Sequence, residues 1–137
     1  MLKKEWYSKV LGTANTICNE KPVEYKIDNG RLLDVSNSAL SRLQYLGFAY
    51  QMTGKERYSQ RGIQELEAIC SFPDWHPDHY LDTAILASAA AIGYDWLYDA
   101  MTQEQRDNIA KKSQELALKT ANEGYTATAS YNDFWCN

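Results

Sequence analysis

The stretch LDTAILASAAAIGYDWLYDAM, residues 81–101, decides the fold class of this chain. Its residues are apolar nearly all round a helix, so a helix formed here belongs inside a larger helical array. The small residues 87–91 and Gly93 allow neighbouring helices to approach closely. Asp82 and Asp95 interrupt the run before it reaches the roughly 20 apolar residues that cross a bilayer. We therefore predict a packed helix and no membrane span.

Helical periodicity also precedes this stretch. Apolar residues at helical spacing predict a helix over residues 4–18 and another from Ser36 or Ser38 to a C-terminal stop at Gly54. A third helix over residues 55–72 has one apolar side, and its opposite side carries Arg61. These segments predict amphipathic helices that share one core.

A capping box marks the start of a fifth helix after the central stretch. Thr102 can cap this helix and Gln105 can reach back to it, and apolar residues then continue to about Ala121. No strand-like alternation competes with these patterns. The predicted fold is all-α, an up-and-down array of about five to six helices.

Three irregular segments, residues 19–35, 73–80 and 124–137, connect or follow the helices. If the helices alternate in direction, the loops after the first, third and fifth helices lie at one end of the array. Irregular loops on a rigid scaffold are where function is usually found. This end would gather the following aromatic, ionisable and amide residues: Trp75, His76, His79, Tyr80, Tyr125, Trp135 and Asn137.

Length, charge and cysteine content narrow the class of protein. The chain has 137 residues, which suits a single domain, and a formal net charge of -4. Its basic residues occur in small groups rather than in a stripe, so no nucleic-acid partner is expected. Cys18, Cys70 and Cys136 form no CxxC pair, and we interpret them as buried free thiols.

Three segments carry a resemblance to a known family: YQMTGKERY (50–58), HYLDTA (79–84) and AIGYDWLYD (91–99). In this order they resemble the heparinase II/III type polysaccharide lyases, and the resemblance extends to the final Cys136-Asn137 pair. The third segment is the best marker of the family. Its apolar spacing before a tight turn indicates a role in packing and helix termination.

The resemblance implies a fold and an activity. Members of this family join an incomplete α/α toroid to C-terminal antiparallel β-sheet domains and cleave uronate-containing polysaccharides by β-elimination. Residues 1–137 would then be a single helical domain, a partial toroid at the N-terminal end of a longer multidomain protein, and inactive alone. The apolar, aromatic final residues are typical of a chain that has been interrupted, so we expect the natural protein to continue beyond them. The family also implies a periplasmic or extracellular location and an acidic polysaccharide or oligosaccharide as partner.

Such an elimination needs a group that neutralises the uronate carboxylate, a base that removes the adjacent ring proton and an acid that protonates the leaving oxygen. The resemblance carries the first role over to Asn137 as the candidate catalytic residue, and leaves the base and the acid unassigned. The candidate substrate-binding residues are Trp75, His76, His79, Tyr80 and Trp135.

Other interpretations remain open at this point. His76 and His79 are the only histidines, and without a third ligand nearby in the sequence they favour neither a metal site nor a cofactor. Paired carboxylates from Asp74, Asp78 and Asp82 would suit a glycoside hydrolase on a related toroid, although Asp82 is better placed to start the next helix. A helical-repeat binding module without catalysis is the third alternative.

Overall fold

The computed structural model describes the backbone of residues 2–127 and the side chains of residues 3–118. Within this part of the chain there are five α-helices, one 3-10 turn and no β-strand, with a single isolated bridge between Asp28 and Arg31. The elements are α1 (Leu2–Cys18), α2 (Leu33–Thr53), α3 (Glu56–Cys70), α4 (Tyr80–Trp96), η1 (Tyr98–Ala100) and α5 (Gln103–Ala127). The predicted all-α class is confirmed.

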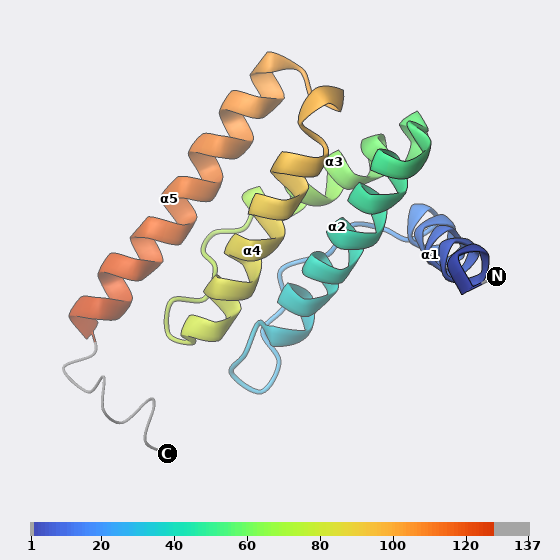
Figure 1. Cartoon of the computed structure of the whole chain (residues 1–137). Helices are drawn as coiled ribbons and strands as arrows, with labels where there is room; N and C mark the ends of the chain where they lie inside the picture. Colours follow the sequence, from blue (N-terminus) through green and yellow to red (C-terminus); the bar gives the residue numbers. More distant parts are fainter. Residues whose placement is uncertain (1, 128–137) are drawn as a thin grey trace.

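The helices from α2 onward form an up-and-down array (Figure 1). In this view α2 and α4 run upward side by side, α3 returns behind them, and α5 descends beside α4. The contact between α2 and α4 is the most extensive in the array, and α4 also packs on α3 and α5. α1 is seen almost end-on and therefore lies across the other helices, against α2 and α3.

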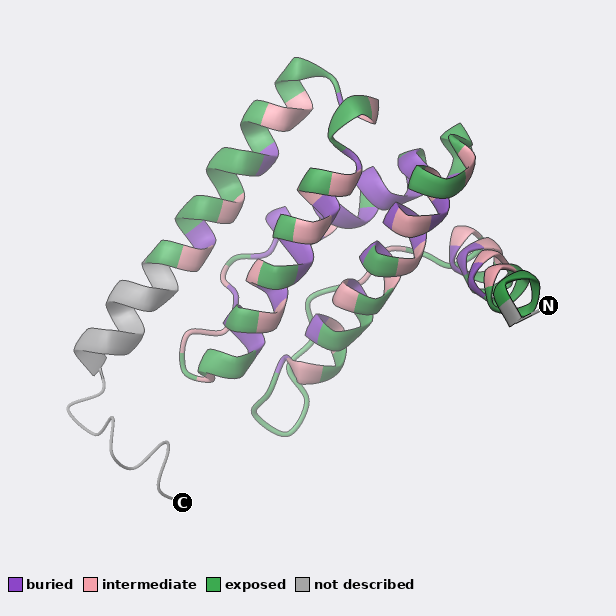
Figure 2. Cartoon of the chain, in the orientation of Figure 1, coloured by how far each residue is buried: buried purple, intermediate pink, exposed green. Residues whose placement is uncertain are grey.

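Two hydrophobic clusters hold the array together. The larger one lies between α2, α3, α4 and α5 and includes Leu43, Leu66 and Leu86, all fully buried. The smaller one fixes α1 through Ala14 and Ile17. Figure 2 shows the buried residues on the inward sides of the helices. One side of α4 stays exposed along residues 81, 84, 88, 91 and 95 in the part of the chain that the structure describes.

Two helix boundaries differ from the sequence prediction. α2 begins at Leu33, one turn before the position that a cap at Ser36 or Ser38 would give. Ser36 is buried, and its hydroxyl donates to the Leu32 carbonyl at 2.9 Å instead of capping the helix. α5 continues to Ala127, past the predicted end at Ala121 and through Gly124.

Other local predictions are confirmed. At the start of α5 the Gln105 N–H donates to Thr102 Oγ1 at 3.1 Å, and the Thr102 N–H donates to Gln105 Oε1 at 3.0 Å, which completes the capping box. Gly54 ends α2 in the left-handed conformation with a φ of 64°. α4 ends at Trp96 within the AIGYDWLYD segment, and Leu97 after it is fully buried. None of the helices in the described chain has the length and apolarity that a membrane crossing requires.

Candidate functional site

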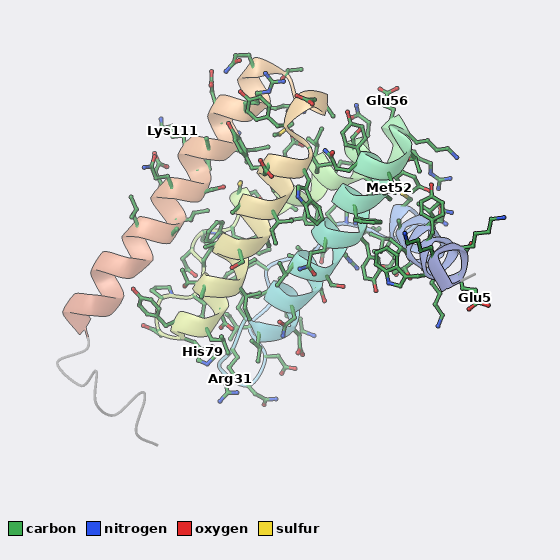
Figure 3. The ribbon with its side chains drawn as sticks, viewed as in Figure 1. Glu5, Arg31, Met52, Glu56, His79 and Lys111 are labelled. Carbon is green, nitrogen blue, oxygen red and sulfur yellow. The ribbon has the colours of Figure 1, made fainter. Side chains whose placement is uncertain are left out.

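The loops after α1 and α3 meet at one end of the array, as the alternation of helices predicts. We call this end the rim and define it as residues 19–32, residues 71–79 and the first turn of α4. Figure 3 shows Arg31 and His79 close to this end, whereas Met52 and Glu56 flank the tight turn at the opposite end. The third predicted loop, residues 124–137, is helical up to Ala127 and otherwise lies outside the described residues.

Asp82 joins the two rim loops. It lies in the first turn of α4 and is fully buried, and its Oδ2 accepts the Leu32 N–H at 2.8 Å. Leu32 is the residue directly before α2, and no side chain caps that helix locally. The carboxylate on α4 therefore fixes the last residue of the preceding loop.

The same carboxylate contacts both histidines of the chain. His76 Nδ1 lies 2.7 Å from Asp82 Oδ2, and His79 Nδ1 lies 3.0 Å from Asp82 Oδ1. The two imidazole centroids are 6.3 Å apart. A buried carboxylate thus orients two half-buried imidazoles, an arrangement suited to binding a polar ligand or a cation.

The backbone around His76 is held in an uncommon conformation. His76 has a φ of 54°, in the left-handed region that a non-glycine residue seldom adopts. Its N–H donates to Asp74 Oδ1 at 2.8 Å, and the Tyr25 hydroxyl donates to the same oxygen at 2.9 Å. Asp74 therefore secures both the turn that presents His76 and the neighbouring loop.

Two titratable groups of the rim have shifted pKa values. Burial acts to raise the pKa of Asp82, but the hydrogen bond from Leu32 and the contacts with His76 and His79 outweigh it and lower this pKa. The pKa of Tyr25 is raised to about 12, first by burial and then by the hydrogen bond to the Asp74 carboxylate and its charge. Asp82 therefore stays ionised near neutral pH, and Tyr25 stays protonated.

A second buried carboxylate, Glu65 of α3, anchors the start of the first rim loop. Its Oε2 accepts from Arg61 Nη1 at 2.6 Å, and its Oε1 accepts the Val23 N–H at 3.1 Å. Arg42 of α2 adds hydrogen bonds to the Lys21 carbonyl and to the Glu20 carboxylate. Arg61 is buried, so the prediction that it lies on an outward face is wrong: it faces the loop, and Glu65 balances its charge.

The predicted site residues have different surroundings. His76 and His79 lie together and are reachable from solvent, with 15% and 17% of their side chains exposed, and Tyr80 is exposed at the start of α4. Trp75 is in the core: it has no exposed surface, and its indole N–H donates to the Ile69 carbonyl at 2.9 Å. Stacking of Trp75 on a sugar is therefore not supported by its position. Trp135 and Asn137 lie outside the described residues, as does the side chain of Tyr125.

Of the two described cysteines, Cys70 fits the expectation of a buried free thiol and Cys18 fits it only in part. Cys70 is buried and free, and burial raises the pKa of its thiol. Cys18 is free but half-buried rather than buried. Cys136 lies outside the described residues. Neither of the two described thiols belongs to the rim.

Asp82 is the candidate site residue most of whose contacts could not be foreseen from the sequence. As a helix-starting residue it was expected to act within α4, but its carboxylate contacts a loop some fifty positions earlier and two histidines. The spacing of His79 and Asp82 could have indicated their contact, since residues three apart at a helix start share one side, but His76 lies in the preceding loop. One ligand atom from each of these residues lies within 4.8 Å of the others.

Comparison with models of known protein families and with curated proteins finds no match for this chain.

Proposed function

We propose that this chain is the helical part of a polysaccharide lyase and forms one wall of a cleft that binds uronate-containing glycans. One observation carries the proposal: His76 and His79, singled out from the sequence as substrate contacts, lie together on the rim and are oriented by the buried Asp82. Tyr80, with 40% of its surface exposed, follows His79 as the first residue of α4. Imidazole donors and an exposed aromatic ring at the same end of the array suit a hydroxylated, acidic sugar.

The resemblance to the heparinase II/III type lyases supports the same proposal. The segments that carry it, residues 50–58, 79–84 and 91–99, include the start of α4 at the rim and the turn at its far end. The exposed side of α4, at residues 81, 84, 88, 91 and 95, is mostly small or apolar, as expected where further helices of an α/α toroid would pack. The remaining catalytic groups and the β-sheet domains of the family would come from other parts of a longer protein. This protein would act in the periplasm or outside the cell.

A glycan titration of the 137-residue chain tests the binding role. The probes are hexasaccharides of alginate, hyaluronan, heparosan and polygalacturonate, with cellohexaose as a neutral reference, and the measurement is amide chemical shift by NMR. We expect at least one uronate oligosaccharide to shift amides of residues 19–32 and 71–80. Tyr80→Ala should weaken this binding several-fold, whereas Tyr98→Ala should not, because Tyr98 is similarly exposed at the opposite end of α4.

An activity assay of the protein encoded by the complete reading frame tests whether the reaction is a β-elimination. A lyase releases a 4,5-unsaturated uronate, which absorbs in the ultraviolet, from the glycan that binds. New reducing ends without this absorbance would show hydrolysis and would favour a glycoside hydrolase over a lyase. Binding without cleavage would leave a non-catalytic helical module, and absence of uronate binding at the rim would reject the glycan role.

A further inference from the structure

The cluster of His76, His79 and Asp82 has the donor atoms of a metal site. Two imidazole nitrogens and a carboxylate oxygen converge within 4.8 Å. Sequence reasoning gave no metal because two histidines lacked a third ligand, and the structure brings Asp82 to both of them. We infer that these three residues bind a divalent transition-metal ion, with zinc as the best fit.

The donor set favours zinc over the alkaline-earth ions. Imidazole nitrogen and carboxylate oxygen are regular zinc ligands, whereas magnesium and calcium prefer ligand sets made of oxygen alone. Two neutral imidazoles and the ionised Asp82 would offset one of the two charges of the ion. The three residues also leave a fourth tetrahedral position for water or for an oxygen of a ligand.

Rotation of the three side chains would bring their ligand atoms around the ion. Neighbouring ligand atoms in a tetrahedral zinc site lie about 3.3 Å apart, as follows from zinc–ligand distances of roughly 2.0–2.1 Å. His76 Nδ1 lies 2.7 Å from Oδ2 of Asp82, and His79 Nδ1 lies 3.0 Å from the other oxygen, Oδ1. Because the ligand atoms of the three residues lie within 4.8 Å of one another, the side chains would shift by up to about 1.5 Å to reach this spacing. The ion would take the place of the protons that the imidazoles share with the carboxylate. Both histidines are partly exposed, which gives the ion a path from solvent.

Residues around the cluster hold the ligands in position. The Leu32 N–H donates to Asp82 Oδ2, and Asp74 accepts the N–H of His76 in its left-handed conformation. Thr83 donates to the Trp75 carbonyl at 2.7 Å and so ties α4 to the loop that carries His76. Such outer contacts fix ligand orientation in metal sites, and their loss commonly weakens metal binding 10- to 100-fold.

A zinc titration of the complete, untagged chain tests the inference without any glycan, so its outcome is separate from that of the proposed function. The chain is stripped with a chelator, and zinc binding is measured by competition with a chromophoric chelator. We expect one zinc ion per chain and a higher Tm with zinc than without. His76→Gln and His79→Gln should each weaken binding at least about tenfold, since these are the only two histidines.

Asp78→Asn is the matched control, because Asp78 is an exposed carboxylate in the same loop and lies outside the cluster. It should retain the affinity of the unsubstituted chain, and Asp82→Asn should lose it. Circular dichroism establishes that each variant is folded; if Asp82→Asn unfolds, the two histidine variants decide the matter.

Cobalt separates this site from a site made by the cysteines. Cobalt bound to nitrogen and oxygen should show visible absorption bands of a tetrahedral ion without the near-ultraviolet band of a cobalt–thiolate bond. A thiolate band, equal zinc affinity in the doubly substituted His76→Gln, His79→Gln chain, or no zinc bound to the folded protein would each overturn the inference.

Discussion

At the residue scale, two buried carboxylates organise the rim, and each is satisfied by groups from distant segments. Asp82 accepts from Leu32 and contacts both histidines, while Glu65 accepts from Arg61 and from the Val23 N–H. A buried carboxylate without such partners would cost several kcal/mol. Side chains of α3 and α4 thus fix the loops, together with hydrogen bonds among the loop residues themselves, such as those that Asp74 accepts from Tyr25 and His76.

Tyr25 provides a test of this organisation through its titration. Its pKa is raised to about 12, first by burial and then by the hydrogen bond and charge of Asp74. Because the folded-state pKa exceeds the unfolded value near 10, this group stabilises the fold fully below about pH 10 and loses that contribution as the pH rises towards 12. Urea denaturation across this range should therefore show a smaller alkaline loss of stability in Tyr25→Phe than in the unsubstituted chain.

Asp74→Asn gives the control for the cause of the shift. Removing the negative charge should bring the Tyr25 pKa back towards 10. The titration of Tyr25 is the difference in phenolate absorbance between chains with and without the Tyr25→Phe substitution. A Tyr25 midpoint near 10 in the unsubstituted chain would contradict the described hydrogen bond.

The sequence could identify the rim histidines but not what holds them. His76, His79 and Tyr80 stand out as polar and aromatic residues between two helices, and loop parity places them correctly. The roles of Asp82, Arg61 and Glu65 depend on contacts with residues 41–50 positions away. Trp75 is ambiguous for the same reason, since a loop tryptophan can pack inward or outward and only the tertiary structure decides.

At the element scale, small residues set how closely the helices pack. Gly47 of α2 faces Trp96 of α4: a Cβ added there would lie 2.8 Å from Trp96 Cε3 and 3.2 Å from its Cβ. A Cβ on Gly93 of α4 would meet Leu66 and Leu43 at 2.8 Å and 2.9 Å. The expectation that Gly93 permits close approach is confirmed.

Helix periods and caps could be predicted from the sequence, but the start of α2 could not, because a tertiary hydrogen bond from Leu32 to Asp82 replaces a local cap.

Gly47→Ala tests the contact between α2 and α4. The new methyl group would press on a bulky indole near its backbone attachment, so we expect a loss of about 1–3 kcal/mol in the free energy of unfolding. Gly12→Ala is the matched control, since Gly12 lies within α1 with no atom within 4 Å of an added Cβ. This change should be neutral or should stabilise the protein by up to about 1 kcal/mol. Equal effects of the two substitutions in urea denaturation would show that α2 and α4 are not in close contact.

At the scale of the whole molecule, the two hydrophobic clusters predict that different parts of the chain differ in stability. The larger cluster joins α2, α3, α4 and α5, whereas α1 is held by the smaller cluster and by a hydrogen bond from the Tyr58 hydroxyl to Asn15 Oδ1 at 2.8 Å. Segments with fewer buried contacts open at lower free energy than the core. The rim loops contribute Leu32, Phe72 and Trp75 to the larger cluster, so we expect the candidate site to belong to the more stable part of the molecule.

This division predicts the order of amide hydrogen exchange. Amides of α4, which packs against α2, α3 and α5, should exchange slowest, and amides of α1 should exchange faster through local opening. Tyr58→Phe removes the bond to Asn15 and should cost about 1 kcal/mol, which raises the open population of α1 roughly fivefold. Tyr45→Phe is the control, because Tyr45 packs on the same small cluster, whereas the bond to Asn15 Oδ1 is made by the Tyr58 hydroxyl. If Tyr58→Phe accelerates exchange in α1 and α4 to the same extent, then α1 opens only when the whole molecule unfolds. If the acceleration is confined to α1, then α1 opens locally while the rim stays folded.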